Sequence, residues 1–420
     1  MAKFLIKGNK KLSGIIKVSG SKNAALPLLA ASLLVDGEVV LKNIPKIKDT
    51  QIMLEILKYL GSKIDFKENS LVINNKNIVY REIPPELSEK IRGSILFAGP
   101  LLFRFGKAEI NKPGGCLIGK RPITTHLNAF KSIGAKIIEK NNKYFLELNR
   151  PNLERPVILD EMSVTATENI LMALAFSGKI KIRLASFEPE VIHLAEFLKN
   201  LGANFKNLGT PFLEVEKGKI LGKKIVFENI FDRIEAATYI ILAAIVGRKI
   251  EIQNVPLNHL DSFLNTLKKI GLEFSFNNDK VIFEEKEKRL KPIFIRTDIY
   301  PNFPTDCAPL ISVLLTQCNG RSFIFETMYD GRLNYLRELV KMGADIEILS
   351  SYLAAIKGPT FLHAVPVKAL DLRSGAALVL AALSAEGETQ IDNIEIIERG
   401  YENIEEKLKN IGAEIKRLEE

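Results

Sequence analysis

The sequence predicts an α/β protein made of two similar lobes, and three observations support this prediction. A chain of 420 residues is longer than one hydrophobic core usually serves, so two domains are expected. The composition, with 46% hydrophobic and 26% charged residues, is typical of a folded globular protein. A helix-then-glycine pattern also recurs six times, with a period of about 70 residues.

The first recurring pattern is an amphipathic segment that ends at a glycine and continues into an alternating stretch. It reads LKYLGSKI, FKSIGAKI, FLKNLGANF, LKKIGLEF, LVKMGADI and LKNIGAEI. Glycine ends a helix readily because it adopts the left-handed conformation without steric cost, so each copy predicts a helix followed by a strand. The glycines concerned are Gly61, Gly134, Gly202, Gly271, Gly343 and Gly412.

A second pattern runs in step with the first and has a largely apolar helix before its glycine, as in ILMALAFSGKIKI and YIILAAIVGRKIEI. A helix that is apolar on every side is a buried one. Each of the six units is therefore expected to hold a buried helix, a strand, an amphipathic helix and a further strand or hairpin. Three units in each lobe would pack their apolar helices inward and their sheets outward, and the chain would divide near residue 230.

Composition excludes several classes of protein. The N-terminus MAKFLIKGNKKLSG has no apolar core of a signal peptide, and the longest apolar stretches fall short of the roughly 18 residues that span a membrane. A cytoplasmic protein with no membrane association is expected. The three cysteines are odd in number and lack metal-like spacing, which predicts reduced thiols and no metal. The net charge of +9 fits either a solvated basic surface or a cationic cleft for small polyanions.

Two segments between the repeats are candidates for binding anions. Lys22 and Asn23, in SGSKNAALP, open the first buried helix, where a cation and exposed N–H groups can hold an anion; an ordinary helix cap is the alternative. The segment KPGGCLIGKRP places Cys116 among glycines and close to two cationic side chains. Such a setting lowers a thiol pKa, so Cys116 is a candidate reactive thiol, whereas Cys307 and Cys318 are expected to be packing residues.

Acidic and arginine residues open three further helices. Asp306, in FPTD, is either a helix cap or a general base. Arg373, in DLR, and Arg399, in ERGY, either form weak surface pairs with neighbouring acids or clamp a carboxylate or phosphate. The histidines form no catalytic or metal-binding pattern, and no ATP or dinucleotide motif is present, so no cofactor is expected.

Several motifs together resemble those of the bacterial UDP-N-acetylglucosamine 1-carboxyvinyltransferases, a family of enolpyruvyl transferases. The matching segments extend from end to end and include SGSKNAALP, PGGCLIGKRP, EPEVIHLAEFLKNLGA, FPTD, LDLRSGAALVLAAL and ERGYENIEEKLKNIGA. The resemblance implies an inside-out α/β barrel of two lobes whose closure assembles the site. It also implies that residues 22–230 form the lobe with the cysteine loop, and that the first strand, at about residues 1–21, joins residues 231–420 in the other lobe.

The resemblance further implies transfer of the enolpyruvyl group of phosphoenolpyruvate to UDP-N-acetylglucosamine, without a cofactor, a nucleic acid or an obligate protein partner. Cys116 would be the general acid and Asp306 the general base. Lys22, Arg121 and Arg399 would bind phosphoenolpyruvate, with Arg92 and Arg373 nearby, Asn23 touching the substrates and Asp371 orienting these cations. The UDP-sugar would contact Met328 and two segments, of which the first is Arg121, Pro122, Ile123, Thr124 and Thr125 and the second is Ser163, Val164 and Thr165.

Two residues depart from the pattern of the family: Thr165 stands where many members have glycine, and Ile396 where some have histidine. Two other functions stay open. One is the sister reaction on shikimate 3-phosphate, whose enzymes lack the PGGC loop. The other is a nucleic-acid-binding scaffold built from repeats, against which the dispersed charge argues.

Overall fold

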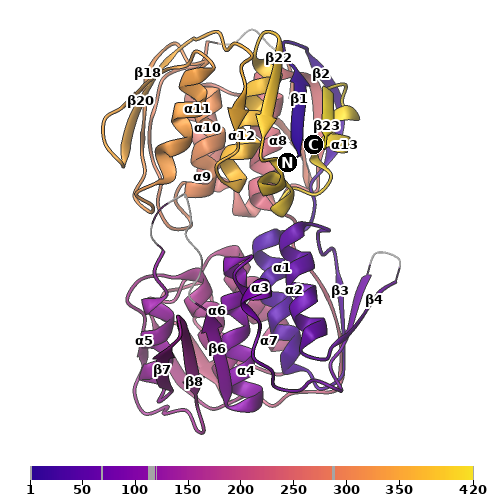
Figure 1. Ribbon diagram of the computed structural model, residues 1–420. Helices are drawn as coiled ribbons and strands as arrows, with labels where there is room; N and C mark the ends of the chain where they lie inside the picture. Colours follow the sequence, from indigo (N-terminus) through magenta and orange to yellow (C-terminus); the bar gives the residue numbers. More distant parts are fainter. Residues whose placement is uncertain (1, 68–69, 112–118, 120, 286–288, 420) are drawn as a thin grey trace. The chain divides into compact units, whose positions relative to one another are not determined.

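The computed structural model describes residues 2–67, 70–111, 119, 121–285 and 289–419, which form two compact units. The N-terminal unit consists of Gly20–Gly115 and Arg121–Ile230. The C-terminal unit consists of Met1–Ser19 and Phe231–Glu420, and Gly119 groups with it. Each unit has its own hydrophobic core, and the predicted six-repeat α/β architecture is confirmed (Figure 1).

Three apolar helices lie at the centre of each unit, because no face of them is polar enough to meet water. Their side chains are almost all buried, and three more amphipathic helices pack beside them. In the N-terminal unit the apolar helices are α1 (Lys22–Ala31), α4 (Ala98–Phe105) and α6 (Val164–Leu174), and the amphipathic ones are α2 (Lys48–Tyr59), α5 (Thr124–Ser132) and α7 (Pro189–Asn200). In the C-terminal unit the apolar helices are α8 (Arg233–Val246), α10 (Ala308–Leu315) and α12 (Leu372–Ser384). The amphipathic helices of this unit are α9 (Asp261–Ile270), α11 (Leu336–Lys341) and α13 (Ile404–Lys409).

Three sheets surround the helices of the N-terminal unit. Their strand orders are β13-β3-β5-β4, β6-β8-β7 and β11-β12-β10-β9. The bounds are β3 (Glu38–Lys42), β4 (Lys63–Lys67), β5 (Ser70–Asn74), β6 (Lys107–Asn111), β7 (Lys136–Lys140), β8 (Lys143–Glu147), β9 (Val157–Ile158), β10 (Ile180–Arg183), β11 (Asn204–Lys206), β12 (Glu214–Glu216) and β13 (Lys224–Glu228). β13 lies parallel to β3, so the last strand of the third repeat completes the sheet of the first repeat.

The C-terminal unit has three sheets of the same kind, with orders β15-β16-β14-β2, β17-β18-β20-β19 and β21-β22-β1-β23. The bounds are β1 (Lys3–Lys7), β2 (Leu12–Lys17), β14 (Gly247–Gln253), β15 (Ser275–Asn277), β16 (Lys280–Glu284), β17 (Phe294–Arg296), β18 (Gly320–Phe325), β19 (Asp345–Ile348), β20 (Leu353–Gly358), β21 (Val367–Lys368), β22 (Glu388–Asp392) and β23 (Glu414–Leu418). None of the helices described here combines the length and the apolar character needed to cross a bilayer.

The N-terminal residues belong to the C-terminal unit as two strands. β1 lies between β22 and β23 and is antiparallel to both, with Lys3 opposite Asp392 on one side and Leu418 on the other. β2 lies parallel to β14 in a different sheet. The resemblance to the transferase family implies a single first strand over residues 1–21; the segment instead completes two sheets.

The six glycines of the first repeat pattern have φ values between 92° and 106°, which is the left-handed region. Each follows an amphipathic helix and precedes the strand of its repeat, as the sequence predicts. In the second repeat Gly134 donates its N–H to Lys131 O, which closes the last turn of α5.

Candidate active site

Lys22 is the first residue of α1, directly after Ser21, whose hydroxyl accepts from Ala24 N and caps the helix. The Lys22 ammonium lies 2.7 Å from Asp49 Oδ2 in the first turn of α2, and both side chains are largely buried, with 13% and 3% exposure. Asn23 is half-buried beside Lys22. Ser21 therefore provides the helix cap that the sequence allows, and the neighbouring Lys22 provides the cation of the anion-binding hypothesis.

Arg92 begins the 3₁₀ helix η2 (Arg92–Phe97), which precedes α4. Its guanidinium donates from Nη1 to Arg121 O at 2.6 Å and from Nη2 to Pro122 O at 3.3 Å. This fork fixes the course of the main chain at the start of the segment 121–125. Arg92 thus has a structural task in addition to any contact with a ligand.

The two segments expected to contact the UDP-sugar lie side by side. Thr125 Oγ1 donates to Glu161 Oε1 at 3.4 Å, and Asn128 Nδ2 donates to Asp160 Oδ2 at 2.9 Å. These bonds join the beginning of α5 to the turn before α6, where the Ser163 hydroxyl accepts from Ala166 N and caps the helix. Residues 121–125 and 163–165 therefore form one continuous region of the N-terminal unit.

His126 is the buried residue that ties this region to the interior, with 2% of its surface exposed. Its Nε2 lies 3.0 Å from Thr165 Oγ1 and its Nδ1 lies 3.1 Å from Asn169 Nδ2. Burial, together with the positive charge of Arg92, lowers the pKa of His126 to about 3. The imidazole is therefore neutral at physiological pH.

Asp306 lies in the 3₁₀ helix η4 (Thr305–Cys307) of the C-terminal unit, ahead of α10. Its carboxylate accepts from Arg332 Nη2 at 2.6 Å and from Arg373 Nε at 3.4 Å, and 30% of its side chain stays exposed. The described contacts of Asp306 are thus those of a carboxylate held by two arginines, and its role as a base stays a prediction.

Asp371 caps a helix. It accepts from the N–H groups of Arg373 and Ser374 at the start of α12, and its carboxylate also lies 3.7 Å from Arg332 Nη1. The Arg373 side chain turns toward Asp306 and stacks on the Tyr401 ring at 5.3 Å. The surface pair that the sequence allowed for Asp371 and Arg373 is therefore not formed.

Two arginines hold Asp306 from the buried side: Arg332 is 2% exposed and Arg373 is 3% exposed. Burial opposes the charged form of each, but nearby groups outweigh it. Asp306 and Asp371 raise the pKa of Arg332, and Tyr401 with Asp306 raises that of Arg373. Both guanidinium groups stay charged, and Arg373 Nη1 is buried without a hydrogen-bond partner among the described residues.

Arg399 ends the 3₁₀ helix η6 (Ile394–Arg399) and is half-buried. Its neighbour Glu398 accepts from Arg417 Nε at 2.8 Å. Met328 donates its backbone N–H to the buried Glu326 at 2.8 Å, so a main-chain contact from Met328 to a sugar would have to come from its carbonyl group.

Sequence reasoning missed Asp49, Arg332 and Glu326. Arg332 opens the 3₁₀ helix η5 (Arg332–Tyr335) before α11, a place in its repeat comparable to that of Arg399 before α13. The presence of Arg332 at this recurring place was the signal in the sequence that could have identified it as a candidate site residue. Glu326 accepts from Thr305 Oγ1 at 2.8 Å, and Arg332 Nε donates to the same hydroxyl at 3.1 Å, so these residues brace the turn that carries Asp306.

The structure describes two of the three cysteines. Cys307 and Cys318 are buried, and burial raises the pKa of each thiol to about 12, which confirms them as packing residues. Cys116 lies outside the described residues. Within the described part of the chain no group of His, Cys, Asp or Glu is arranged to hold a metal ion.

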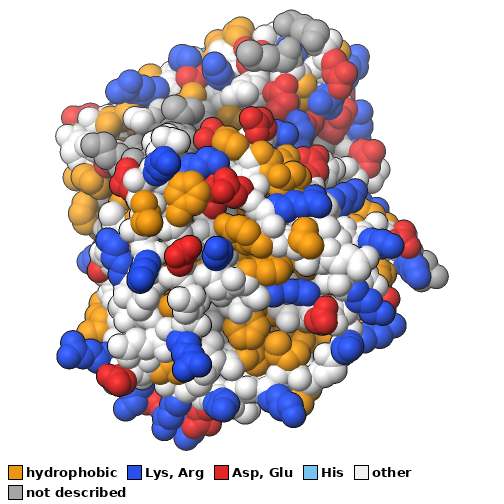
Figure 2. All heavy atoms as spheres, turned by 60° about the horizontal axis from the view of Figure 1, so that its bottom comes forward, with side chains coloured by type: hydrophobic (Ala, Val, Ile, Leu, Met, Phe, Trp, Pro, Cys, Tyr) orange, Lys and Arg blue, Asp and Glu red, His pale blue; other side chains and the backbone are white. Residues whose placement is uncertain are grey.

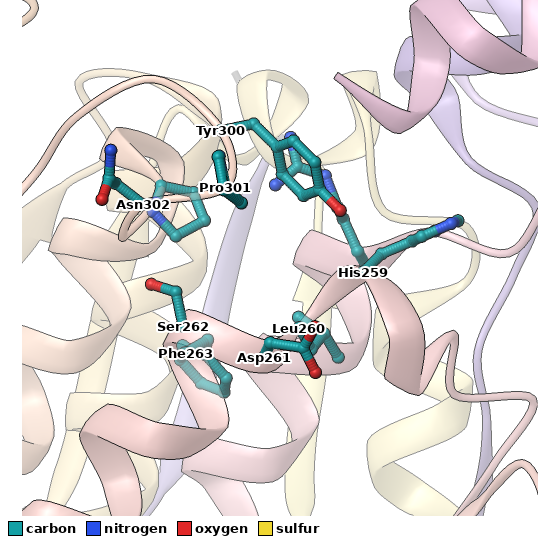
Figure 3. Close-up of a pocket in the computed structure, with 10 residues that line it drawn as sticks. His259, Leu260, Asp261, Ser262, Phe263, Tyr300, Pro301 and Asn302 are labelled. Carbon is teal, nitrogen blue, oxygen red and sulfur yellow. The ribbon is translucent and has the colours of Figure 1, made fainter. Parts of the chain in front are cut away.

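A shallow pocket in the C-terminal unit is separate from the predicted residues. It is lined by His259–Phe263 at the start of α9, by Tyr300–Asn302, and by Arg233 and Pro304. Figure 3 shows the Tyr300 side chain directed toward the His259 ring at the edge of this pocket. None of the predicted site residues lines the pocket, although Pro304 lies two positions before Asp306.

The distribution of surface charge bears on the nucleic-acid hypothesis. On the face drawn in Figure 2, lysine and arginine side chains are dispersed among acidic and apolar ones. Many pair with acids at the surface, as Lys224 does with Glu38 and Lys249 with Glu284. Neighbouring acids thus neutralise at least part of the basic surface of each unit.

Two solved structures share the fold of the whole chain. The enolpyruvyl transferase NikO from Streptomyces tendae superposes with a TM-score of 0.90 at 22% identity, covering 99% of both chains. EPSP synthase from Acinetobacter baumannii has a TM-score of 0.78 at 16% identity and covers both chains completely. The two-unit fold is thus the fold of the enolpyruvyl transferases.

The family model described as EPSP synthase (3-phosphoshikimate 1-carboxyvinyltransferase) matches residues 6–408, and the chain belongs to this family. Relatives named UDP-N-acetylglucosamine 1-carboxyvinyltransferase are far closer in sequence than the two solved structures. One from Campylobacter jejuni is 41% identical over 99% of both chains. One from Carboxydothermus hydrogenoformans is 44% identical over 100% of this chain and 99% of its own. The resemblance expected from the motifs is confirmed.

The buried position of Arg332 leads to a first prediction. Arg332→Ala removes the partner of Asp306 and Asp371 and should lower the free energy of unfolding by about 3 kcal/mol or more. Chemical denaturation measures this loss. Arg296→Ala is the matched control, because Arg296 pairs with Asp298 at the surface and is 62% exposed, so its loss should cost less than about 1 kcal/mol. Equal effects of the two substitutions would contradict the prediction.

His126 leads to a second prediction, on pH. The unfolded chain takes up a proton near pH 6.5 and the folded chain does so only near pH 3, so the stability of the wild type falls as the pH decreases through this range. Relative to His126→Gln, the wild type should lose about 1 kcal/mol of unfolding free energy between pH 6.5 and 5.5. Denaturation at both pH values tests this, with the exposed His363→Gln as control. Parallel pH profiles of wild type and His126→Gln would refute the prediction.

Proposed function

We propose that this chain transfers the enolpyruvyl (carboxyvinyl) group of phosphoenolpyruvate to the 3'-hydroxyl of UDP-N-acetylglucosamine, with release of phosphate. The observation that carries the proposal is the agreement over the full length with relatives that bear the name of this activity, at 41% to 44% identity. The anchored carboxylate of Asp306 supports it, because the reaction needs a base for the sugar hydroxyl.

Asp306 is suited to the role of general base. Two buried guanidinium groups fix its carboxylate from the interior, and opposite charges within 4 Å favour the ionised form that can accept a proton. The exposed part of the side chain leaves room for a hydroxyl group to approach. Arg332 and Asp371 would act as positioning residues, because they touch the base and its support.

The proposed ligands of phosphoenolpyruvate are Lys22, Arg121 and Arg399, with Asn23, Arg92 and Arg373 close to the substrates. Fixed cations bind a trianion and stabilise its phosphate as it leaves. In this chain the Lys22 ammonium is already oriented by Asp49, and Arg92 already holds the main chain at Arg121. Such preorganisation reduces the cost of ordering the site when the substrate binds.

Cys116 is the proposed general acid, and its role is taken from the resemblance alone. Addition of the sugar hydroxyl develops positive charge at C2 of phosphoenolpyruvate while C3 gains a proton, so an acid and a base are both required. Proton transfer by positioned side chains contributes roughly 10²–10⁴-fold to the rate. The rest would come from alignment of the substrates and from closure over them.

The UDP-sugar is proposed to bind along residues 121–125 and 163–165, with Met328 touching the sugar. The support is that the two segments form one region in the N-terminal unit, at the N-termini of α5 and α6, where main-chain N–H groups and the helix dipole favour a diphosphate. The chain would need no cofactor and no metal.

In the cell, we propose that the chain acts in the cytoplasm at the first committed step of peptidoglycan synthesis. Its activity would then support the cell wall, cell shape and cell division. The alternative acceptor is shikimate 3-phosphate, because the family model carries that name. The PGGC segment with Cys116 argues against this acceptor, and the dispersed surface charge argues against a nucleic-acid scaffold.

Phosphate release tests the proposed activity directly. Phosphoenolpyruvate with UDP-N-acetylglucosamine should release phosphate, whereas phosphoenolpyruvate with shikimate 3-phosphate should not. Asp306→Ala should abolish turnover because the base is lost, while calorimetry still detects binding of the UDP-sugar. Turnover with shikimate 3-phosphate, or full activity of Asp306→Ala, would refute the corresponding assignment.

Fosfomycin tests the thiol. A thiol is alkylated through its thiolate, and the cationic residues near Cys116 in the sequence favour that form, so fosfomycin should alkylate Cys116, and intact-mass analysis should show one adduct. Cys116→Ser should form no adduct and give resistance, whereas Cys307→Ser should still be modified because the Cys307 thiol is buried and protonated. An active enzyme that forms no adduct would overturn the assignment of Cys116.

A further inference from the structure

A chain of hydrogen bonds runs from the surface of the N-terminal unit to its core through α6 and α5. Thr165, in the first turn of α6, contacts His126 Nε2 at 3.0 Å, and His126 Nδ1 contacts Asn169 Nδ2 at 3.1 Å. Asn169 lies one turn after Thr165 on the same helix. The Asn169 side chain is itself held at both ends, since it donates to Ile95 O at 3.0 Å and its Oδ1 accepts from Gly99 N at 2.8 Å.

These contacts determine which way each proton points. Because Asn169 Oδ1 accepts from a backbone N–H, its amide nitrogen must face His126, and a nitrogen with two hydrogens can only donate. His126 Nδ1 is therefore an acceptor, which places the single ring proton on Nε2. Burial keeps the ring neutral, with a pKa of about 3, so no second proton is available. The Nε2–H group donates to Thr165 Oγ1, so the hydroxyl of Thr165 acts as acceptor in this bond.

The hydroxyl proton of Thr165 is then directed elsewhere. Thr165 is half-exposed, whereas His126 and Asn169 are buried, and within the part of the chain that the structure describes this proton has no acceptor. A hydroxyl whose acceptor capacity is already used toward the interior presents a donor toward the surface. The donor stands at the N-terminus of an eleven-residue helix, beside the cap residue Ser163.

We propose that His126 and Asn169 are positioning residues that fix the Thr165 hydroxyl as a hydrogen-bond donor to a diphosphate oxygen of the bound nucleotide sugar. This inference rests on the proposed function. The side chain supplies a donor whose direction is set before the ligand arrives, and a preorganised donor to an anion is a strong one.

A purely structural role would not require this arrangement. Asn169 already links α6 to η2 and α4 through Ile95 and Gly99, and Ser163 already caps α6. Asn169 also bonds His126 and so joins α5 to α6 without Thr165. Loss of the Thr165 hydroxyl would leave the buried Nε2–H of His126 without its acceptor and lower stability, but only a role in binding predicts a change that is specific to the diphosphate.

The primary test compares Thr165→Val, which removes the donor at nearly constant shape, with Thr165→Ser, which keeps it. Thr165→Val should raise the KM for UDP-N-acetylglucosamine about tenfold, the effect of one charge-assisted hydrogen bond, and leave kcat and the KM for phosphoenolpyruvate within about twofold. Thr165→Ser should behave like the wild type. The matched control is Thr266→Val on α9, whose hydroxyl bonds within its own helix to Ser262 O. This substitution should leave all three constants unchanged.

Calorimetry separates the diphosphate from the rest of the ligand without turnover. Thr165→Val should weaken UDP binding about tenfold and leave uridine binding unchanged, because uridine lacks the diphosphate. If UDP and uridine respond equally, or if neither responds, the inference is wrong.

Variants of His126 test its action through Thr165. His126→Gln puts an amide donor near the position of Nε2, while His126→Asn is too short to reach Thr165, so the glutamine variant should keep more affinity for UDP. In a double-mutant cycle, adding His126→Asn to Thr165→Val should not weaken UDP binding beyond the effect of Thr165→Val alone, because both substitutions remove the same hydrogen bond. Additive losses would contradict the inference. If the His126 variants do not fold, the comparison of Thr165→Val with Thr165→Ser still decides whether the Thr165 hydroxyl donates to the diphosphate.

The two proposals fail in different ways. An enzyme that releases no phosphate with UDP-N-acetylglucosamine contradicts the proposed function. An active wild-type enzyme whose Thr165→Val variant keeps the wild-type KM and the wild-type affinity for UDP contradicts only the role of Thr165, His126 and Asn169.

Discussion

The constraint on which the structure depends is that the three central helices of each unit are buried over most of their length. A polar residue inside such a helix needs a buried hydrogen-bond partner, as Asn169 has, whereas the ends of the helix are the places where polar groups avoid large desolvation costs. The candidate residues follow this rule. Lys22, Thr165 and Arg373 each lie in the first turn of a buried helix, and Arg92 and Asp306 lie in the short 3₁₀ helices that precede two others. Packing of the repeats thus selects where polar chemistry can occur.

The two units stabilise their buried polar groups in different ways. The C-terminal unit surrounds its buried arginines with acids, so that Arg332 lies between Asp306 and Asp371. The N-terminal unit uses neutral groups as well: burial, reinforced by Glu190 and Glu188, raises the pKa of Glu168 far above its usual range, and burial lowers that of His126. Full ion pairs keep charge available to a ligand, whereas neutral groups fix direction without adding charge.

The fold could be predicted because its signals are local and repeated. The glycine after each amphipathic helix and the predominance of apolar residues in each central helix are visible in short windows. The contacts within the site could not be predicted, because they join residues that lie in different elements and far apart in the sequence. Arg332 meets Asp306 across 26 residues and His126 meets Asn169 across 43. Nothing near Asp306 in the sequence distinguishes a helix cap from an anchored carboxylate, as the cap at Asp371 illustrates.

The position of β1 between β22 and β23 has a consequence for biosynthesis. A ribosome makes the chain from its N-terminus, so Gly20–Ile230 is complete long before the strands that flank β1 exist. The N-terminal unit can therefore fold while translation continues. β2 can pair once β14 is made at Gly247–Gln253, but β1 must wait until β22 and β23 are made near the end of synthesis. An unpaired strand edge invites intermolecular association, so the N-terminal strand is exposed to it for longer than any other strand of its unit.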